Sequence, residues 1–284
     1  MNSNLDFLIE NINLDLYPIH NKGCEDYKLA VSNFRIQLDE FGCAHLQNFI
    51  KDEKLTLIKE QSESVASLAH YHENEITPYA TEVDKSLDKS HPINRLQKFS
   101  NGFVAKDLLP EEMIIKNLYK NDFFKSFIAD CLDLDVIYEY EDPIAGLVIN
   151  VMPEDTALPW HFDTNEFIVS LMTRKPESGG EFQYSPSIRQ PGNENYQGVQ
   201  EILDGDMSSV KSLTLDTGDL QLFKGRFSMH RVAPCKGTRL CALFGYSDKE
   251  GVMGRVKRTK DVYGRVTQAH IDAELKVRED GLAG

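Results

Sequence analysis

The sequence predicts an α+β protein in which a mainly helical N-terminal half packs outside a β-sandwich or jelly-roll core. Three observations predict this arrangement. Apolar residues recur with the helical period before about residue 140. Short runs rich in branched and aromatic residues follow it, and turn residues rather than helices separate these runs.

Three segments of the first half have the apolar spacing of amphipathic helices. In Tyr27–Glu40 the apolar positions recur every three or four residues, and similar patterns run from about Lys54 to His70 and from about Pro110 to Leu132. A proline followed by two glutamates is typical of a first helical turn, so we expect the third helix to begin at Pro110.

The second half has the composition of short strands. Six runs are expected to be strands, at residues 144–152, 166–173, 180–184, 210–215, 219–223 and 239–246. Glycine, proline, asparagine and aspartate gather between them, which is the chemistry of turns. We therefore expect residues 1–284 to form one domain, with a mainly helical part (1–140), a β core (141–250) and a C-terminal extension (251–284).

The composition excludes several classes of function. A formal net charge of −14 would repel a polyanion, so nucleic acid is not expected as a partner. The same charge permits a cationic small substrate, although acidity also simply aids solubility. No apolar run is long enough to cross a membrane, and the first residues lack the pattern of a secretory signal.

The five cysteines are scattered, odd in number and without a CxxC pair. A disulfide framework or a thiolate zinc site is therefore not expected, and a reducing, cytoplasmic setting fits best. The sequence does not determine an oligomeric state, and a homodimer is left open.

The motif with the clearest chemical meaning is His161-Phe162-Asp163, which follows a predicted strand. Residues i and i+2 of a strand point to the same face, so His161 and Asp163 can reach one metal ion together. His230 follows a second strand-like run and can supply a third ligand. Two imidazoles and one carboxylate form the facial triad of non-haem iron(II) oxygenases, which leaves coordination positions open.

Each of these residues also has an ordinary explanation. An HxD pair is common by chance, and a single histidine such as His230 is more often hydrogen-bonded or on the surface. Their order, separation and β context together favour the metal site.

Arg239 stands at the start of the strand that follows His230. If 2-oxoglutarate chelates the metal through its keto-acid end, its far carboxylate needs a buried cation. The planar fork of arginine binds a carboxylate through two parallel hydrogen bonds. Taken alone, Arg239 would more simply be a surface arginine at a strand start, but the triad favours the ligand role.

These motifs resemble the iron(II)/2-oxoglutarate dioxygenase superfamily over about residues 144–246. The markers are HFD (161–163), SGGEFQY (178–184), DTGDLQLF (216–223) and MHRVAPCKGTR (229–239). The resemblance implies a double-stranded β-helix, that is, a jelly-roll, cupin-like core. It also implies iron(II), 2-oxoglutarate and O2 as cofactor and co-substrates.

A narrower resemblance covers about residues 28–265. HPINR (91–95), YEDP (140–143), WHFDTNEF (160–167) and GRFSMHRV (225–232) are similar to the free-amino-acid radical halogenases, of which the lysine chlorinase is familiar, and to their hydroxylase relatives. In the halogenases, glycine replaces the triad carboxylate and opens a site for chloride. Asp163 fills that site here, so the resemblance implies hydroxylation of an unactivated C–H bond of a small substrate, a free amino acid.

The resemblance also implies residues that contact substrate or co-substrate. Arg95 is similar to the arginine that holds the amino acid's carboxylate, and Glu141 or Asp142 to the acid that takes an ammonium group. Thr164, Asn165, Glu166 and Ser247 are further expected polar contacts, and Asn150 is expected to bind the co-substrate. Each of them has an alternative as an ordinary loop or core residue.

Two positions depart from the pattern. Cys241 stands where many members of the superfamily have a serine, and Leu158 stands where the amino-acid group often has histidine.

Three alternative functions remain open. They are a non-catalytic cupin-type sensor, the same cofactors with desaturation, ring closure or epimerisation, and hydroxylation of a protein-bound or carrier-bound residue.

Overall fold

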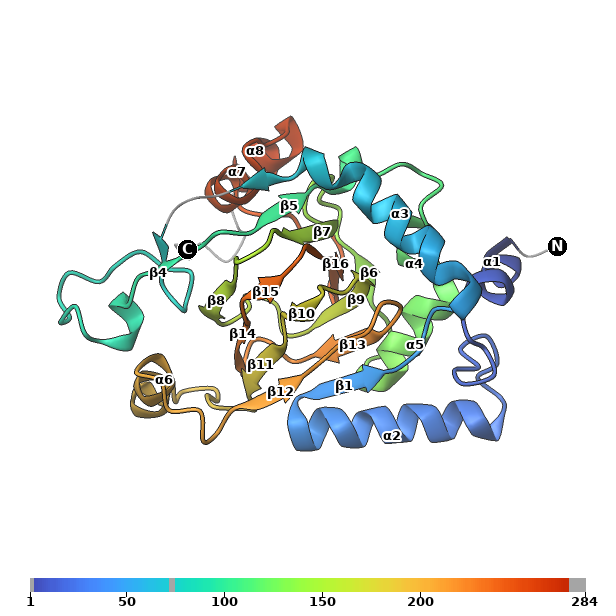
Figure 1. Cartoon of the computed structure of the whole chain (residues 1–284), viewed down its shortest axis with the longest axis horizontal. Coiled ribbons are helices and arrows are strands. Elements are labelled where there is room, and N and C mark those ends of the chain that lie inside the picture. Colours follow the sequence, from blue (N-terminus) through green and yellow to red (C-terminus); the bar gives the residue numbers. More distant parts are fainter. Residues whose placement is uncertain (1–2, 72–74, 276–284) are drawn as a thin grey trace.

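The structure of the chain is a computed structural model that describes residues 3–71 and 75–275. Helices α1 (Ser3–Asn11), α2 (Glu25–Phe41), α3 (Leu55–Val65), α4 (Ile114–Lys120) and α5 (Asp122–Leu132) come from the first half. They lie along one side of the β core (Figure 1). Within the described residues, no helix combines the length and apolar character needed to cross a bilayer.

The third expected helix is instead two helices. The segment does not become helical at Pro110 but at Ile114, and it is interrupted at Asn121. The side chain of Asn121 accepts hydrogen bonds from the backbone N–H groups of Phe123 and Phe124 and so caps α5. An asparagine that bonds its own following backbone competes with a continuous helix, and here it starts a new one.

The larger sheet has seven strands, and every pair in it is antiparallel. In spatial order these are β1 (Cys43–Leu46), β13 (Leu220–Phe223), β9 (Ile168–Arg174), β16 (Arg239–Phe244), β7 (Leu147–Met152), β5 (Gly102–Val104) and β2 (His70–Tyr71). Three of these strands, β1, β2 and β5, come from the part that the sequence predicts to be mainly helical. They are only two to four residues long, too short for a periodic signal.

The smaller sheet has four antiparallel strands, in the order β12 (Lys211–Leu213), β11 (Phe182–Ser185), β14 (Met229–Val232) and β8 (Leu158–His161). Two-stranded ladders join β10 (Ser178–Gly179) to β15 (Cys235–Lys236), β6 (Tyr138–Glu139) to β17 (Tyr246–Ser247) and β3 (Glu75–Ile76) to β4 (Gln97–Lys98). The two main sheets enclose the centre of the molecule (Figure 1). The expected α+β fold with a jelly-roll core is confirmed.

Three further helices lie outside this barrel. Helix α6 (Tyr196–Leu203) interrupts the core strands between β11 and β12, where the sequence predicts only turns. Its apolar face, Val199 and Ile202, packs against Trp160 and Phe162. Helices α7 (Val256–Tyr263) and α8 (Gln268–Leu275) belong to the expected C-terminal extension (251–284), of which residues 276–284 lie outside the described residues.

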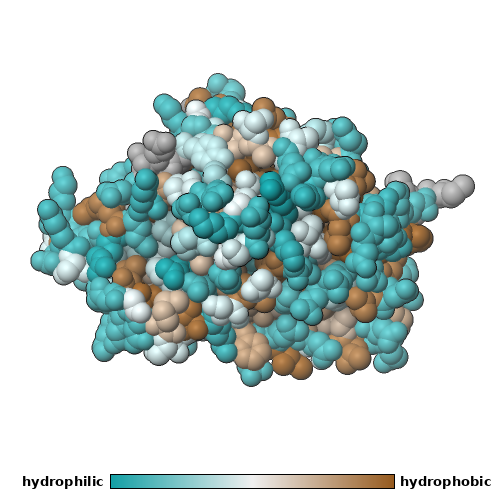
Figure 2. All heavy atoms as spheres, viewed as in Figure 1, coloured by the Kyte–Doolittle hydropathy of each residue, from teal (hydrophilic) through white to brown (hydrophobic). Residues whose placement is uncertain are grey.

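Buried apolar residues of the larger sheet belong to two separate clusters. The main apolar cluster contains β-strand residues such as Leu147, Val169 and Leu222 together with Phe34, Phe124 and Phe127 of the helices. A smaller apolar cluster lies around Phe182, Tyr184 and Phe223. The outer face shown in Figure 2 is mostly hydrophilic, with apolar side chains in small groups. The helices therefore cover one face of the larger sheet, and the barrel interior is left for the site.

Candidate metal centre

The two histidines of the predicted triad face each other across neighbouring strands. His161 is the last residue of β8, and its Cα partner in the antiparallel strand β14 is His230. The centroids of the two imidazole rings are 4.1 Å apart. The sheet register therefore brings together two ligands that are far apart in the sequence.

Asp163 completes the cluster from the loop that follows β8. Its Oδ1 lies 3.8 Å from His161 Nε2 and its Oδ2 lies 3.6 Å from His230 Nε2. One ligand atom from each of the three residues lies within 4.8 Å of the others. Because bonds from such donors to a first-row metal are about 2.0–2.2 Å long, donors up to about 4 Å apart can share one ion.

The backbone sets the orientation of both imidazoles. His161 Nδ1 lies 2.8 Å from the carbonyl oxygen of Pro159, and His230 Nδ1 lies 3.0 Å from that of Ser228. An Nδ1–H that donates to a carbonyl leaves the Nε2 lone pair free, and Nε2 is the atom that faces Asp163. Burial, and to a smaller extent the nearby His230, lower the pKa of His161 to about 4, so this imidazole is neutral and ready to bind a metal at neutral pH.

Asp163 Oδ2 is buried and has no hydrogen-bond partner among the described residues. A buried carboxylate oxygen without a partner is costly, and a cation between the imidazoles and the carboxylate would remove that cost. This donor set fits iron(II), which accepts imidazole and carboxylate ligands on one face.

Arg239, like Asp163, has a buried polar atom without a hydrogen-bond partner among the described residues. It begins β16, is only 3% exposed, and its Nε has no hydrogen-bond partner. No carboxylate in the described part of the chain forms an ion pair with it. Burying an unpaired guanidinium is unfavourable, so this position fits an anionic ligand such as the far carboxylate of 2-oxoglutarate.

Other polar groups, which no sequence motif marks, are also buried in the larger sheet. Ser170 Oγ donates to Gln221 Oε1 at 3.1 Å across the β9–β13 pair, and Gln221 Nε2 donates to Cys43 Sγ. The available signal was a single polar residue inside an otherwise apolar strand, as in EFIVSLMT and DLQLF. Asn150, the expected co-substrate residue, is buried and its Nδ2 lies 3.4 Å from the carbonyl oxygen of Gly102.

The expected substrate residues are not brought together. Arg95 Nη1 pairs with Asp204 Oδ1 at 2.7 Å, and its Nη2 donates to the Leu203 carbonyl at the end of α6. Glu141 is exposed. Ser247 Oγ accepts a hydrogen bond from the Lys249 N–H.

Asp142, another expected substrate residue, lies in the interior of the protein. Its side chain is completely buried. Oδ1 accepts the N–H groups of Ile144 and Ala145, while Oδ2 accepts that of Gly254 and lies 3.1 Å from His270 Nε2. These contacts use both carboxylate oxygens and join the start of β7 to the C-terminal extension.

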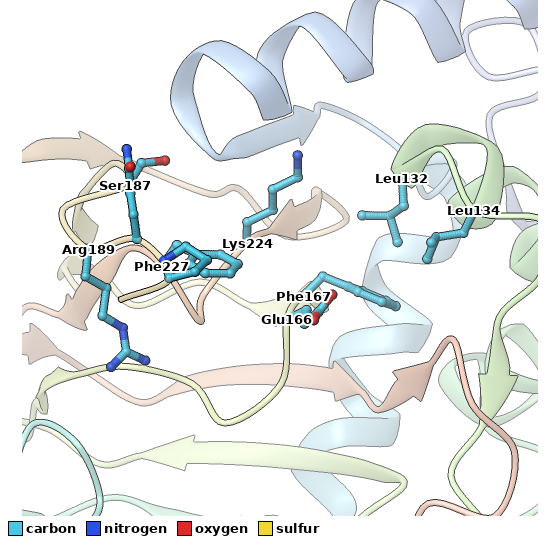
Figure 3. A pocket seen from close by; sticks show the side chains of 10 residues that line it. Leu132, Leu134, Glu166, Phe167, Ser187, Arg189, Lys224 and Phe227 are labelled. Atoms are coloured by element: carbon cyan, nitrogen blue, oxygen red, sulfur yellow. The ribbon is translucent and has the colours of Figure 1, made fainter. Parts of the chain in front are cut away.

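A hollow of about 450 Å³ adjoins the loop between β8 and β9 (residues 162–167, the ligand loop), which carries Asp163. Its wall includes Glu166 and Phe167, which follow Asp163, and Lys224 and Phe227, with Leu132 and Leu134 at the far side (Figure 3). Neither the triad nor Arg239 lines it. Asn165 is half-buried and Glu166 is exposed.

No curated protein matches the chain. A family model described as Halogenase D matches residues 27–262. The chain belongs to this family. The expected membership of the iron(II)/2-oxoglutarate oxygenase superfamily is confirmed by this match together with the fold.

Three solved structures illustrate the fold that this member of the Halogenase D family shares with other proteins. An oxidoreductase of the 2OG-Fe(II) oxygenase family from Burkholderia pseudomallei has 16% identity and a TM-score of 0.52, over 78% of this chain and 92% of that one. AviO1 from Streptomyces viridochromogenes has 15% identity and a TM-score of 0.52, over 81% and 99%. The α-ketoglutarate-dependent epimerase SnoN from nogalamycin biosynthesis has 10% identity and a TM-score of 0.53, over 78% and 83%.

Proposed function

We propose that this chain is an iron(II)- and 2-oxoglutarate-dependent hydroxylase that acts on a free amino acid. The observation that carries the proposal is the carboxylate of Asp163, whose oxygens lie 3.8 Å and 3.6 Å from the Nε2 atoms of His161 and His230 in a family named for halogenases. A carboxylate at this position occupies the coordination site that chloride would need. The ligand set therefore favours hydroxylation over chlorination.

The chain's own residues bind and orient the reactants. His161, Asp163 and His230 would hold the metal on one face, and Arg239 would hold the far carboxylate of 2-oxoglutarate. When bound, iron(II), 2-oxoglutarate and O2 supply the oxidising power for C–H hydroxylation, with succinate and CO2 as the other products. The barrel fixes the distance between target carbon and metal and keeps solvent out.

The buried Arg239, which has no ion-pair partner among the described residues, also argues against the alternative of a non-catalytic sensor. A metal-binding sensor of the cupin type has no need for an uncompensated guanidinium in the barrel, whereas a 2-oxoglutarate enzyme does. Desaturation, ring closure and epimerisation use the same centre and differ only in substrate placement. We further propose a reducing, cytoplasmic setting, which the five free cysteines support.

A mass-spectrometric screen tests the function. The purified protein would be incubated with iron(II), ascorbate, 2-oxoglutarate, chloride and each standard free amino acid. We expect one amino acid to gain a single oxygen atom with matching succinate release. A product that carries chlorine, or one that loses two hydrogens without gaining oxygen, would contradict hydroxylation.

A further inference from the structure

Two arginines that are far apart in the sequence meet at Thr164, the residue after the metal ligand Asp163. Arg258, on α7, donates from Nη1 to Thr164 Oγ1 at 2.8 Å. Arg226, in the loop between β13 and β14, donates from Nη1 to the Thr164 carbonyl oxygen at 3.1 Å. Two guanidinium groups are thus held at one residue of the ligand loop.

Neither arginine has a carboxylate partner in the described part of the chain, although the protein is strongly acidic. Described arginines that do form such an ion pair are Arg35, Arg95, Arg174, Arg189 and Arg265. Of the others, Arg231 stacks on Trp160, Arg239 fits 2-oxoglutarate, and Arg255 precedes α7. Arg226 and Arg258 are therefore uncompensated charges at the same place.

The pair is close to the metal ligands. Arg226 follows Gly225, whose carbonyl accepts the Asp163 N–H at 3.1 Å. Thr164 directly follows Asp163, so both guanidinium groups are held at a residue next to the carboxylate that faces the two imidazoles.

A guanidinium carries five N–H groups in a planar fork, and the contacts described above use only one on each arginine. The remaining donors match the planar geometry of a carboxylate. Both arginines are exposed, so a ligand can reach them from solvent. Arg95, by contrast, is already bonded to Asp204 and to the Leu203 carbonyl.

We propose that Arg258 and Arg226 bind the carboxylate of the substrate and that Thr164 positions the guanidinium of Arg258. This assignment rests on the proposed function, because it presupposes an amino-acid substrate. It places the recognition of the carboxylate on α7 and on the loop between β13 and β14, and it leaves Arg95 as a structural link to α6.

The test compares an acid with its amide. The probe is the standard free amino acid that gives the most succinate release, together with its carboxamide, which has the same side chain and no negative charge. For Arg258→Gln and Arg226→Gln we expect the KM for the acid to rise about 10- to 100-fold, the range for losing a hydrogen bond to a charged group. The KM for the amide should change little.

A matched control lies on the same helix. Lys257→Gln removes one positive charge from α7 and breaks an exposed ion pair with Glu82. It should retain the wild-type preference for acid over amide. Thr164→Val removes only the hydroxyl that holds Arg258 and should lose part of the preference. Titration calorimetry measures the dissociation constants of the same acid and amide without O2, and therefore without turnover. These constants should rank the variants in the same order as the KM values do.

An unchanged acid-to-amide preference in both arginine variants would overturn the assignment while leaving the function intact. If only Arg95→Gln loses the preference for acid over amide, the assignment is also overturned, and Arg95 is then the residue that binds the substrate carboxylate. Stronger competition by inorganic phosphate than by acetate would show a phosphate site and overturn it too. If no amino acid stimulates succinate release by the wild-type protein, the proposed function fails, and this assignment fails with it.

Discussion

The carboxylate of Asp163 occupies the space that a side chain on Gly225 would need. A Cβ built on Gly225 would lie only 1.8 Å from Asp163 Oδ2 and 2.7 Å from its Cγ. Real Cβ contacts never come so close, so the metal ligand and the glycine depend on each other. The Asp163 N–H also donates to the Gly225 carbonyl, so the glycine backbone and its missing side chain both set the position of the ligand.

Gly225→Ala should therefore weaken metal binding without unfolding the protein. The new methyl group would push the carboxylate away from the imidazoles, and displacing a ligand's support typically costs about 10- to 100-fold in metal affinity. Competition with a chelator would measure the affinity for iron(II). Gly23→Ala is the matched control, because its nearest contact would be 3.7 Å away. Equal metal affinity in the two variants would show that the loop adapts.

Asp163→Ala should abolish hydroxylation, because the metal would lose its only carboxylate ligand. The measurement is oxygen incorporation into the amino-acid product, with thermal unfolding as a check that the barrel is intact. Full hydroxylase activity in this variant would show that the ligand assignment is wrong.

Arg239→Ala should mainly raise the KM for 2-oxoglutarate, by about 100-fold or more, because a buried charge pair is lost. Arg239→Lys should recover only part of this loss, since an ammonium cannot form two parallel hydrogen bonds. Arg174→Ala, which breaks a pair with Glu63, is a control for the loss of an arginine in the same sheet. An unchanged KM for 2-oxoglutarate in Arg239→Ala would refute its assigned role.

Asp142→Ala should lower stability rather than substrate affinity. It would leave His270 and three backbone N–H groups buried without their acceptor, at a cost of about 2–4 kcal/mol. Chemical denaturation would measure the loss, and hydrogen exchange should quicken in residues 254–275. Normal stability with a raised KM for the amino acid would instead support a substrate role for this residue.

Asp219 should contribute a pH-dependent part of the stability. Burial raises its pKa, but hydrogen bonds from His45 and from the N–H groups of Asn48 and Asp216 outweigh this and lower it overall. A lowered folded-state pKa stabilises the fold above the unfolded value of about 3.9, and that contribution is lost as the pH falls through the folded value. The stability gap between wild type and Asp219→Asn should therefore be full at pH 6 and shrink below pH 4. A gap that stays constant with pH would contradict this.

The sequence alone was enough to predict the cluster of two histidines and one aspartate, but not the contacts of the residues around it. His161, Asp163 and His230 could be predicted because strand alternation places i and i+2 together and because metal ligation restricts the residue types. The long core strands were predicted for a similar reason, since β7, β9 and β16 are continuous apolar runs.

Substrate contacts are less predictable, because they depend on how loops and helices pack. No local pattern indicates that Arg95 pairs with Asp204, 109 residues away, or that Asp142 meets His270, 128 residues away. The same applies to Arg226 and Arg258, which meet at Thr164 only because α7 folds back over the ligand loop. The short strands β2 and β5 and the inserted helix α6 were missed because tertiary packing, not local composition, stabilises them.

The buried carboxylate of Asp142 has an evolutionary consequence. It ties Gly254 and His270 to the barrel, so the helix between these anchors is held in place independently of what its surface residues are. Substitutions on the exposed surface of α7 can therefore accumulate without loosening the strands that carry His161 and His230. On the proposed assignment of Arg258, such substitutions would alter substrate choice while the metal centre is inherited intact.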